Sequence, residues 1–506
     1  MTRDEGHCEL EACTIHADGA LSEFKPGRVL ASLIDLITPE FFQRRKLLTR
    51  RLGSTAWLDG LRGCAAFSVC LVHLTVYTHA GIEQCYGSEL PGEQKIYNTS
   101  PIVLPFIRLP FLGGHFAVML FFTISGYVVP RRMLQCLHEG RRDDFLAAAQ
   151  SSVIRRPLRL YLPVVLSTFL FASSWHILGI QTPWPKHQNN ILAEWWNWAK
   201  EMLNFFYFFR IGVLFTNYNF HTWTIPVEFR GSMFLVVWLF ALHTIKTRTR
   251  VLLTLGMTLY LAIGAPGAWY ACFFAGMLMS ELDLFAAETS SSAIIFPWDG
   301  FNKWFKCHRL LRTFILEVMM IFGLYLASEP SSDSLTKEQV LGSCRGWKTL
   351  SQLIPDTYGD MYNHHRWFWL FWASWLTLYS AKEIDWMRSA LETRPAQYLG
   401  RHSFALYLVH GPMIGIVSER LFFLTGVKEP IFDDQKKMFG AYYNKWRNIS
   451  WWPFSDGGPQ GLEPNFLVCV AISIPIFLYV AEIGTRLFDL PSIRASKWAW
   501  RKFQSI

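Results

Sequence analysis

An arginine and a histidine lie on one face of a single apolar segment near the start of the chain. Segment 57–79 has the length needed to cross a bilayer, about 20 largely apolar residues, yet it contains Asp59, Arg62 and His73. Arg62 and His73 are eleven positions apart, which in an α-helix is about 16 Å along one face. An ionisable side chain in mid-membrane costs roughly 2.5–3.5 kcal/mol, so it usually faces protein or a wet cavity. The pair offers a fixed cation near one membrane surface and a titratable base deep inside, unless Arg62 only snorkels and His73 only hydrogen-bonds in the core.

A second predicted span, 221–243, places a carboxylate at a similar depth. Glu228 would lie about 10 Å below the outer edge of a core about 30 Å thick, and His73 about 24 Å from the cytosolic start of its span. A carboxylate beside an imidazole orients the ring and raises its basicity, as a general base requires. We therefore expect Glu228 to pair with His73. The alternative is a structural pair of Glu228 with His73 or with Arg230 that only locks helices together.

Two further predicted spans add polar side chains inside apolar runs. Span 398–423 contains Ser403, Tyr407 and His410, with His410 about 18 Å from the cytosolic end. A lone histidine at helical spacing more often hydrogen-bonds in a core than reacts. Span 111–130 contributes His115 near its outer end, and Ser125 with Gly126 near its inner end, where small residues most simply permit close helix packing.

A group of arginines could converge at the cytosolic side of these spans. Snorkelling to headgroups and fixing topology are their simplest roles. They could also form an anion site for a polyphosphorylated ligand, because a guanidinium pairs bidentately with phosphate. The group is Arg62, Arg131, Arg132, Arg155, Arg156, Arg159 and Arg401.

Composition places these segments in a multi-span membrane protein. Of 506 residues, 51% are hydrophobic, 16% aromatic and only 17% charged, against about 25% charged in average soluble chains. The net charge of +9 lies in short clusters beside apolar segments. Such clusters indicate membrane topology first, and a nucleic-acid partner only second. Ten cysteines show no metal-ligand spacing, and we expect no metal.

The positive clusters are satisfied by an all-α bundle of about ten transmembrane helices with both termini cytosolic. This bundle gives a cytosolic N-terminal tail at 1–54, a membrane domain at 55–490 and a cytosolic C-terminal tail at 491–506. The predicted spans are 57–79, 111–130, 157–178, 221–243, 251–265, 267–285, 311–328, 366–381, 398–423 and 464–487. The basic loop 131–156 would be cytosolic.

Several features outside the spans follow from the same topology. Segment 202–215 cannot cross, and we interpret it as re-entrant or interfacial. Residues 29–38 could form a short amphipathic surface helix. The sequons at Asn98 and Asn448 fall in loops assigned outside, where they could be glycosylated. Cys85 and Cys344 also fall outside, and a disulfide between them is possible.

Five motifs, in order, resemble those of the acyltransferase 3 family of membrane proteins. They are L-D-G-L-R-G-x-A-A at 58–66, F-F-T-I-S-G-Y at 121–127, R-R-P-L-R-L-Y-L-P at 155–163, T-W-T-I-P-V-E-F at 222–229 and L-G-R-H-S-F-A-L-Y-L-V-H at 399–410. The fourth motif is similar to the branch found in filamentous fungi; bacterial members usually have Ser-Leu and Glu-Gln or Glu-Glu where this chain has Thr224-Ile225 and Glu228-Phe229.

The resemblance implies transfer of an acyl group, commonly acetyl from acetyl-CoA, to a hydroxyl of a sugar, lipid or small molecule, with no bound cofactor. It also implies that Arg62, His73 and Glu228 are essential. We expect His73, oriented by Glu228, to take the hydroxyl proton while the arginines hold the phosphates of acyl-CoA. Candidate substrate-binding residues are Arg155, Arg156, Arg159, Arg401, Ser125, Trp223, Tyr407 and His410.

Other functions remain open at this point. The acceptor could be a fungal secondary metabolite, a glycan or a lipid headgroup, and the membrane could be the endoplasmic reticulum or the plasma membrane. A transporter or flippase with His73 and Glu228 as a proton relay is the rival class. The absence of a convincing internal repeat argues against it.

Overall fold

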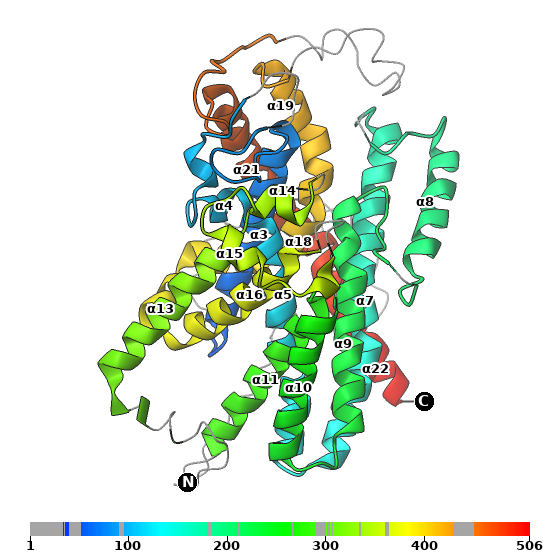
Figure 1. The fold of residues 1–506 in the computed structure, drawn as a ribbon. Coiled ribbons are helices and arrows are strands. Elements are labelled where there is room, and N and C mark those ends of the chain that lie inside the picture. The colour runs from blue at the N-terminus through cyan, green and yellow to red at the C-terminus, as the bar shows by residue number, and fades with distance from the viewer. Residues whose placement is uncertain are drawn as a thin grey trace.

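Helices that run side by side make up the fold (Figure 1). The computed structural model describes residues 34, 36–39, 52–90, 96–180, 182, 184–210, 212–265, 267–288, 300, 304–305, 307–332, 335–359, 364–428 and 450–505. These residues form no strand, and their extended pairings are two isolated bridges, Glu89–Tyr97 and Thr216–Asn219. The all-α prediction is confirmed.

A long helix lies at every predicted span. The long helices are α3 (Ala56–Thr78), α5 (Gly114–Val128), α7 (Arg142–Ile177), α9 (Thr224–Ala241), α10 (Thr247–Gly264), α11 (Trp269–Glu288), α13 (Arg309–Ala327), α16 (Arg366–Glu383), α18 (Arg394–Met413) and α21 (Pro464–Gly484). Short elements connect them: α4 (Arg108–Leu112), α6 (Arg131–His138), α8 (Ile191–Phe205), η3 (Phe220–Trp223), α14 (Lys337–Leu341), α15 (Trp347–Ser351), α17 (Asp385–Leu391), α19 (Glu419–Leu424) and α22 (Leu490–Gln504).

Six helical segments of the described chain are long and apolar enough to cross a membrane. They contain α3, α5, α7, α9, α13 and α21. Helices α10, α11, α16 and α18 have 18 to 20 residues but fall below that apolarity, because tryptophans and charged residues interrupt them. A membrane protein is therefore supported, and ten crossings stay a prediction.

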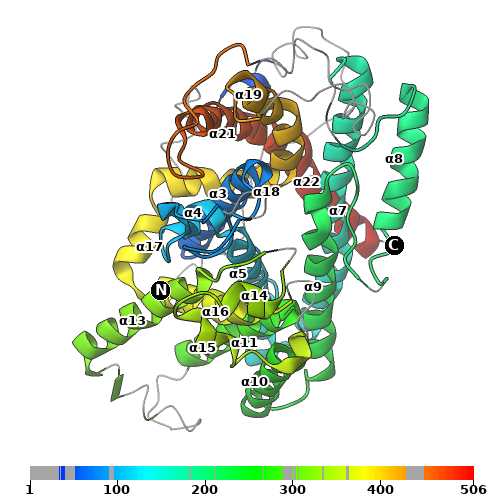
Figure 2. The ribbon, with the colours of Figure 1, turned by 45° about the horizontal axis from the view of Figure 1, so that its top comes forward.

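Three helices extend into segments that the predicted spans leave between or after them. The 36-residue α7 begins at Arg142, so much of the basic loop 131–156 is helix. The expected C-terminal tail is mostly α22, which packs against α7. Segment 202–215 lies mainly after α8, a helix that ends at Phe205 and packs on α7 at the edge of the bundle (Figure 2). The tryptophan-rich residues before 202 supply the amphipathic face that the loop residues lack.

The centre of the bundle is built on close contacts between glycines and backbone. A Cβ on Gly63 of α3 would lie 2.3 Å from the backbone nitrogen of Gly400 in α18. A Cβ on Gly126 of α5 would lie 2.1 Å from the carbonyl oxygen of Phe273 in α11. Since no side chain fits at either place, these helices pack backbone to backbone, as the small residues of the two motifs predict.

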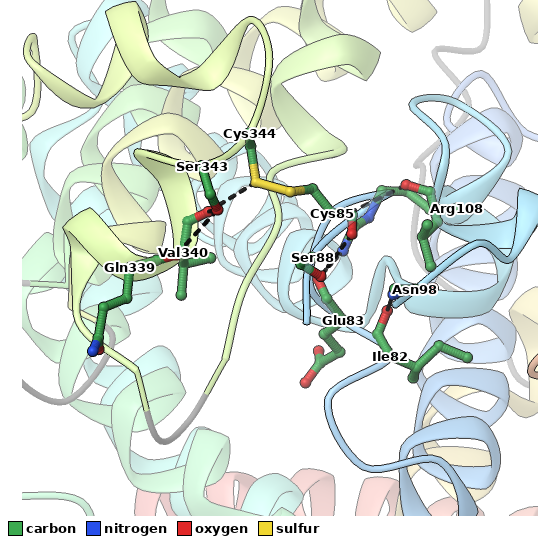
Figure 3. Close-up of a disulfide and its surroundings, with 11 residues drawn as sticks. Ile82, Glu83, Cys85, Ser88, Asn98, Arg108, Gln339, Val340, Ser343 and Cys344 are labelled. Atoms are coloured by element: carbon green, nitrogen blue, oxygen red, sulfur yellow. Dashed lines mark hydrogen bonds between the residues drawn. A yellow bond between two sulfur atoms is a disulfide. The ribbon is translucent and has the colours of Figure 1, made fainter. Parts of the chain in front are cut away.

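One end of the bundle is closed by a disulfide between Cys85, after α3, and Cys344, between α14 and α15, with Cα atoms 6.0 Å apart (Figure 3). We call this the disulfide end. The possible pairing of these two cysteines is confirmed. Of the expected N-terminal surface helix, Ile34, Leu36 and Ile37 are helical, Thr38 is in a bend, and 29–33 and 35 lie outside the described residues.

Candidate active site

Three histidines from three elements meet inside the bundle toward the disulfide end. His73 comes from α3, His221 from η3 and His410 from α18. The ring centroids of His73 and His221 are 3.9 Å apart, those of His73 and His410 5.2 Å, and those of His221 and His410 4.6 Å. One ring nitrogen of each lies within 4.8 Å of the others, so these described residues could also hold a metal ion.

Local contacts fix the position of His221. The phenol of Tyr407 donates to the carbonyl oxygen of His221 and lies 2.7 Å from the hydroxyl of Thr224. Gly411 is required beside His221, because a Cβ there would lie 2.4 Å from Cδ2 of that ring. The loop before η3 is tied to α18 as well, since the amide of Asn219 donates to the carbonyl of Leu408 at 2.8 Å.

Polar atoms without partners point to a ligand at the histidines. Nδ1 of His410 lies 3.3 Å from the carbonyl oxygen of Leu406, which assigns the ring proton to Nδ1 and leaves Nε2 as a hydrogen-bond acceptor. That Nε2 atom and Oδ1 of Asn219 are buried without a hydrogen-bond partner in the described chain. Buried polar atoms are normally paired, so a bound polar group is expected beside them.

The expected pair of Glu228 and His73 is wrong. The carboxylate of Glu228 instead accepts from the guanidinium of Arg156 and from the hydroxyl of Ser125, and no hydrogen bond joins it to His73 in the described residues. The predicted depth of Glu228 in the bundle is the source of the error, because His221 lies at the level of His73. Glu228 follows seven residues later, about 10 Å farther along the helix.

The opposite end of α3 faces a group of arginines. Arg62, Arg155, Arg156 and Asp489 all lie within electrostatic range of Arg159. The guanidinium of Arg156 also donates to Ser232 at 2.6 Å. With Glu228 on Arg156, this group contains more positive than negative charge, and we call it the arginine cluster: Arg62, Arg155, Arg156 and Arg159.

Of the seven arginines that could converge, three have other contacts in the described residues. Arg131 lies at α11, where it donates to the phenol of Tyr127 at 3.1 Å and lies 3.5 Å from Ser280. Arg132 lies near Cys136 instead. Arg401 lies over the ring of Tyr398 at 5.9 Å.

The remaining predicted site residues divide between the two ends. Ser125 lies with Glu228 in the arginine cluster. Tyr407 and His410 lie at the histidines, and Trp223 lies beside them with its ring 5.5 Å from Trp269. Ser403 only returns its hydroxyl to the carbonyl of Gly400.

A charge network near the disulfide lies within electrostatic range of His73. His115 is 3.5 Å from the carboxylate of Glu83 and 2.6 Å from Arg366, and both His115 and Glu83 act on His73 electrostatically. Burial alone would raise the pKa of Glu83, but the hydrogen bond from His115 and the charges of Arg366 and Arg108 lower it to about 2. Glu83 is therefore an anion at neutral pH, and it acts on His73 electrostatically without contacting it in the described residues.

Two further residues of the site went unrecognised in the sequence. His221 could have been found from the same depth arithmetic, because it stands at the outer start of a predicted span and His73 lies near the outer end of its own. Asp489 gave no such signal, since its position beside Arg159 depends on the turn from α21 into α22.

Of the two predicted glycosylation sites, the structure describes Asn98 and not Asn448. Asn98 is buried, and its amide nitrogen donates to the carbonyl of Ile82 at 3.3 Å (Figure 3). A glycan on that nitrogen would have to displace this contact. Asn448 lies outside the described residues.

Comparison with known proteins agrees with the motifs. The model of a family described as an acyltransferase domain matches residues 55–480. The chain belongs to the acyltransferase 3 family. It is an acyltransferase, of the fungal type.

The acyltransferase is similar over most of its length to characterised fungal relatives. It is 28% identical over 496 residues to O-acetyltransferase PaAT-1 of Phomopsis amygdali, which covers 93% of this chain and 89% of that protein. It is 24% identical over 404 residues to acyltransferase clz18 of Cochliobolus lunatus, covering 70% and 82%. No solved structure matches the chain.

Proposed function

We propose that the protein transfers an acyl group, acetyl in the first instance, from acyl-CoA to a hydroxyl of a small molecule at a membrane. The observation that carries this proposal is the arrangement along α3: an arginine cluster at one end and three clustered histidines about 16 Å away. A relative named as an O-acetyltransferase supports acetyl as the group transferred and oxygen as its destination.

The arginine cluster suits the nucleotide end of the donor. The phosphates of CoA carry several negative charges, and planar guanidinium groups bind them bidentately. Arg62, Arg156 and Arg159 would hold them, with Glu228 positioning Arg156. The pantetheine arm, an extended chain, would then run beside α3 to bring the thioester to His73.

The three histidines suit the reacting groups. His73 removes the proton from the acceptor hydroxyl, whose oxygen attacks the thioester carbonyl. The carbon–sulfur bond then breaks, and the proton passes from His73 to the departing CoA sulfur, so that no other reactant is consumed. His221 and His410 confine the ring of His73, while the negative charge of Glu83 favours the imidazolium formed during transfer.

The disulfide supports the proposed orientation. Disulfides persist in oxidising compartments and are rare in the cytosol, so the disulfide end would face the lumen of the endoplasmic reticulum or the cell exterior. The arginine cluster and both termini would then face the cytosol, where acyl-CoA is available. A glycan or a lipid headgroup is the alternative acceptor.

The test measures release of free CoA by the purified protein in lipid nanodiscs. The protein is supplied with acetyl-CoA and with an alcohol-containing extract of the cells that naturally express it. We expect CoA release that requires the extract, together with acetylated products detected by mass spectrometry. If acetyl-CoA stays intact, and the protein in liposomes instead carries extract compounds across the membrane, the protein is a transporter and the proposal is wrong.

A further inference from the structure

An aromatic pocket opens beside the three histidines. Its volume is about 860 Å³, within the range of roughly 300–1,000 Å³ that small-molecule sites occupy. Aromatic rings from four parts of the chain form most of its wall: Trp184, Phe215, Phe220, Trp223, Trp269 and Trp367. Such a wall favours a ligand with a large apolar surface.

Two residues that line the pocket each carry a buried polar atom without a partner. Nε1 of Trp269 and Nδ1 of His364 are buried and make no hydrogen bond within the described residues. An indole N–H can only donate, so Nε1 of Trp269 lacks an acceptor that an oxygen of a bound ligand could supply. Asn217 is the other polar side chain among those that line it.

The pocket adjoins the three histidines at η3. Phe220 and Trp223 line the pocket and flank His221 in the same short helix. The rings of Phe220 and His221 are 4.2 Å apart, and His221 is 3.9 Å from His73. The unpaired Oδ1 of Asn219 and Nε2 of His410 lie at the histidines. Unpaired polar atoms therefore occur both in residues that line the pocket and beside the candidate base.

We propose that this pocket binds the acceptor, and that the acceptor is a bulky, mostly apolar alcohol with at least one further oxygen. The inference rests on the proposed function and names the acceptor class for the same site. A ring system would pack between the tryptophans, its second oxygen would accept from Trp269, and its hydroxyl would reach past Phe220 to His221 and His73. A free sugar is a poorer fit, because Asn217, His364 and Trp269 offer few partners for its several hydroxyls.

Binding is tested without reliance on activity by photolabelling the full-length protein in nanodiscs. The probe is abietinol, a tricyclic diterpene alcohol, carrying a diazirine, and a diazirine phospholipid serves as the comparison. We expect the abietinol probe to label peptides that contain Phe220–Trp223 and Trp367, with unlabelled abietinol competing and methyl glucoside not competing. Equal labelling by the phospholipid, or labelling confined to other peptides, would overturn the inference.

Kinetics then separate the pocket from the reaction. Trp367→Ala should raise KM for abietinol about tenfold, by loss of ring contact, with KM for acetyl-CoA unchanged. Trp372→Ala removes the same ring from the same helix outside the pocket and should match the unmodified protein. Equal effects of the two variants, or acetylation of methyl glucoside in preference to abietinol, would overturn the acceptor class while leaving acyl transfer intact. Labelling of the pocket without acetyl transfer to any alcohol would instead count against the proposed function.

Discussion

At the scale of single residues, charge divides the site into two parts with separate duties. The arginine cluster is positively charged and lies at one end of α3, while the histidines lie three turns away. Each part should therefore affect a different kinetic constant: the arginines the binding of the donor, and His73 the chemical step.

Arg62→Ala should raise KM for acetyl-CoA by roughly 10- to 100-fold, the loss of about 1.5–3 kcal/mol for hydrogen bonds to a charged group. The variant should show no such change with acetyl-pantetheine, which lacks the nucleotide phosphates. Arg131→Ala, which removes an arginine held at Tyr127 instead, is the matched control. A KM for acetyl-CoA that stays level in Arg62→Ala would remove the phosphate role.

The sequence predicts those site residues whose positions depend on a single helix, and misses those whose positions depend on packing between elements. Arg62 and His73 could be placed because they lie on one helix whose geometry is regular. His410 was found because it interrupts an apolar run. The partner of His73 could not be found, because it depends on where η3 begins and on how α9 slides against α3, and a shift of seven residues exchanges Glu228 for His221.

At the scale of helices, the motif at 58–66 contributes glycines to helix packing as well as Arg62 to the candidate site. Gly60 and Gly63 stand on either side of Leu61 and Arg62, so α3 meets α17 and α18 with backbone while Arg62 lies in the cluster. The carbonyl of Leu391, the last residue of α17, would lie 1.9 Å from a Cβ on Gly60. The helices themselves were predictable from apolar runs, whereas the extra turns of α7 and α22 were not, because they are polar and are held by contact with each other.

Gly63→Ala should lower the free energy of unfolding by about 1–3 kcal/mol, since the added methyl meets backbone that cannot rotate away. Gly256→Ala in α10, where a Cβ meets nothing within 4 Å, should be neutral or stabilising by up to about 1 kcal/mol. Thermal unfolding in the same detergent measures both. Equal midpoints for the two variants would show that α3 and α18 do not pack backbone to backbone.

At the scale of the whole molecule, one covalent link joins parts of the chain 259 residues apart. It connects the loop after α3, which carries Glu83, to the α14–α15 segment. The same loop therefore couples the disulfide to the charge network around His115 and so to the environment of His73.

Cys344→Ser should lower the free energy of unfolding by about 2–4 kcal/mol. Cys307→Ser, which removes an exposed free thiol, should leave it unchanged. Non-reducing peptide mapping of protein from native membranes should find Cys85 joined to Cys344. Free, alkylated thiols at both positions would place this end in the cytosol and reverse the proposed orientation.

The central claim is tested most directly by the transfer rate of His73→Gln in the purified protein, at saturating acetyl-CoA and with the cell-extract acceptors. We expect kcat to fall about 10²- to 10⁴-fold, the usual contribution of a general base, with an unchanged KM for acetyl-CoA and an unchanged thermal midpoint. His79→Gln, the same substitution six residues later at the end of α3, should keep its rate within a few-fold. A folded His73→Gln protein that transfers acetyl as fast as His79→Gln would contradict the account.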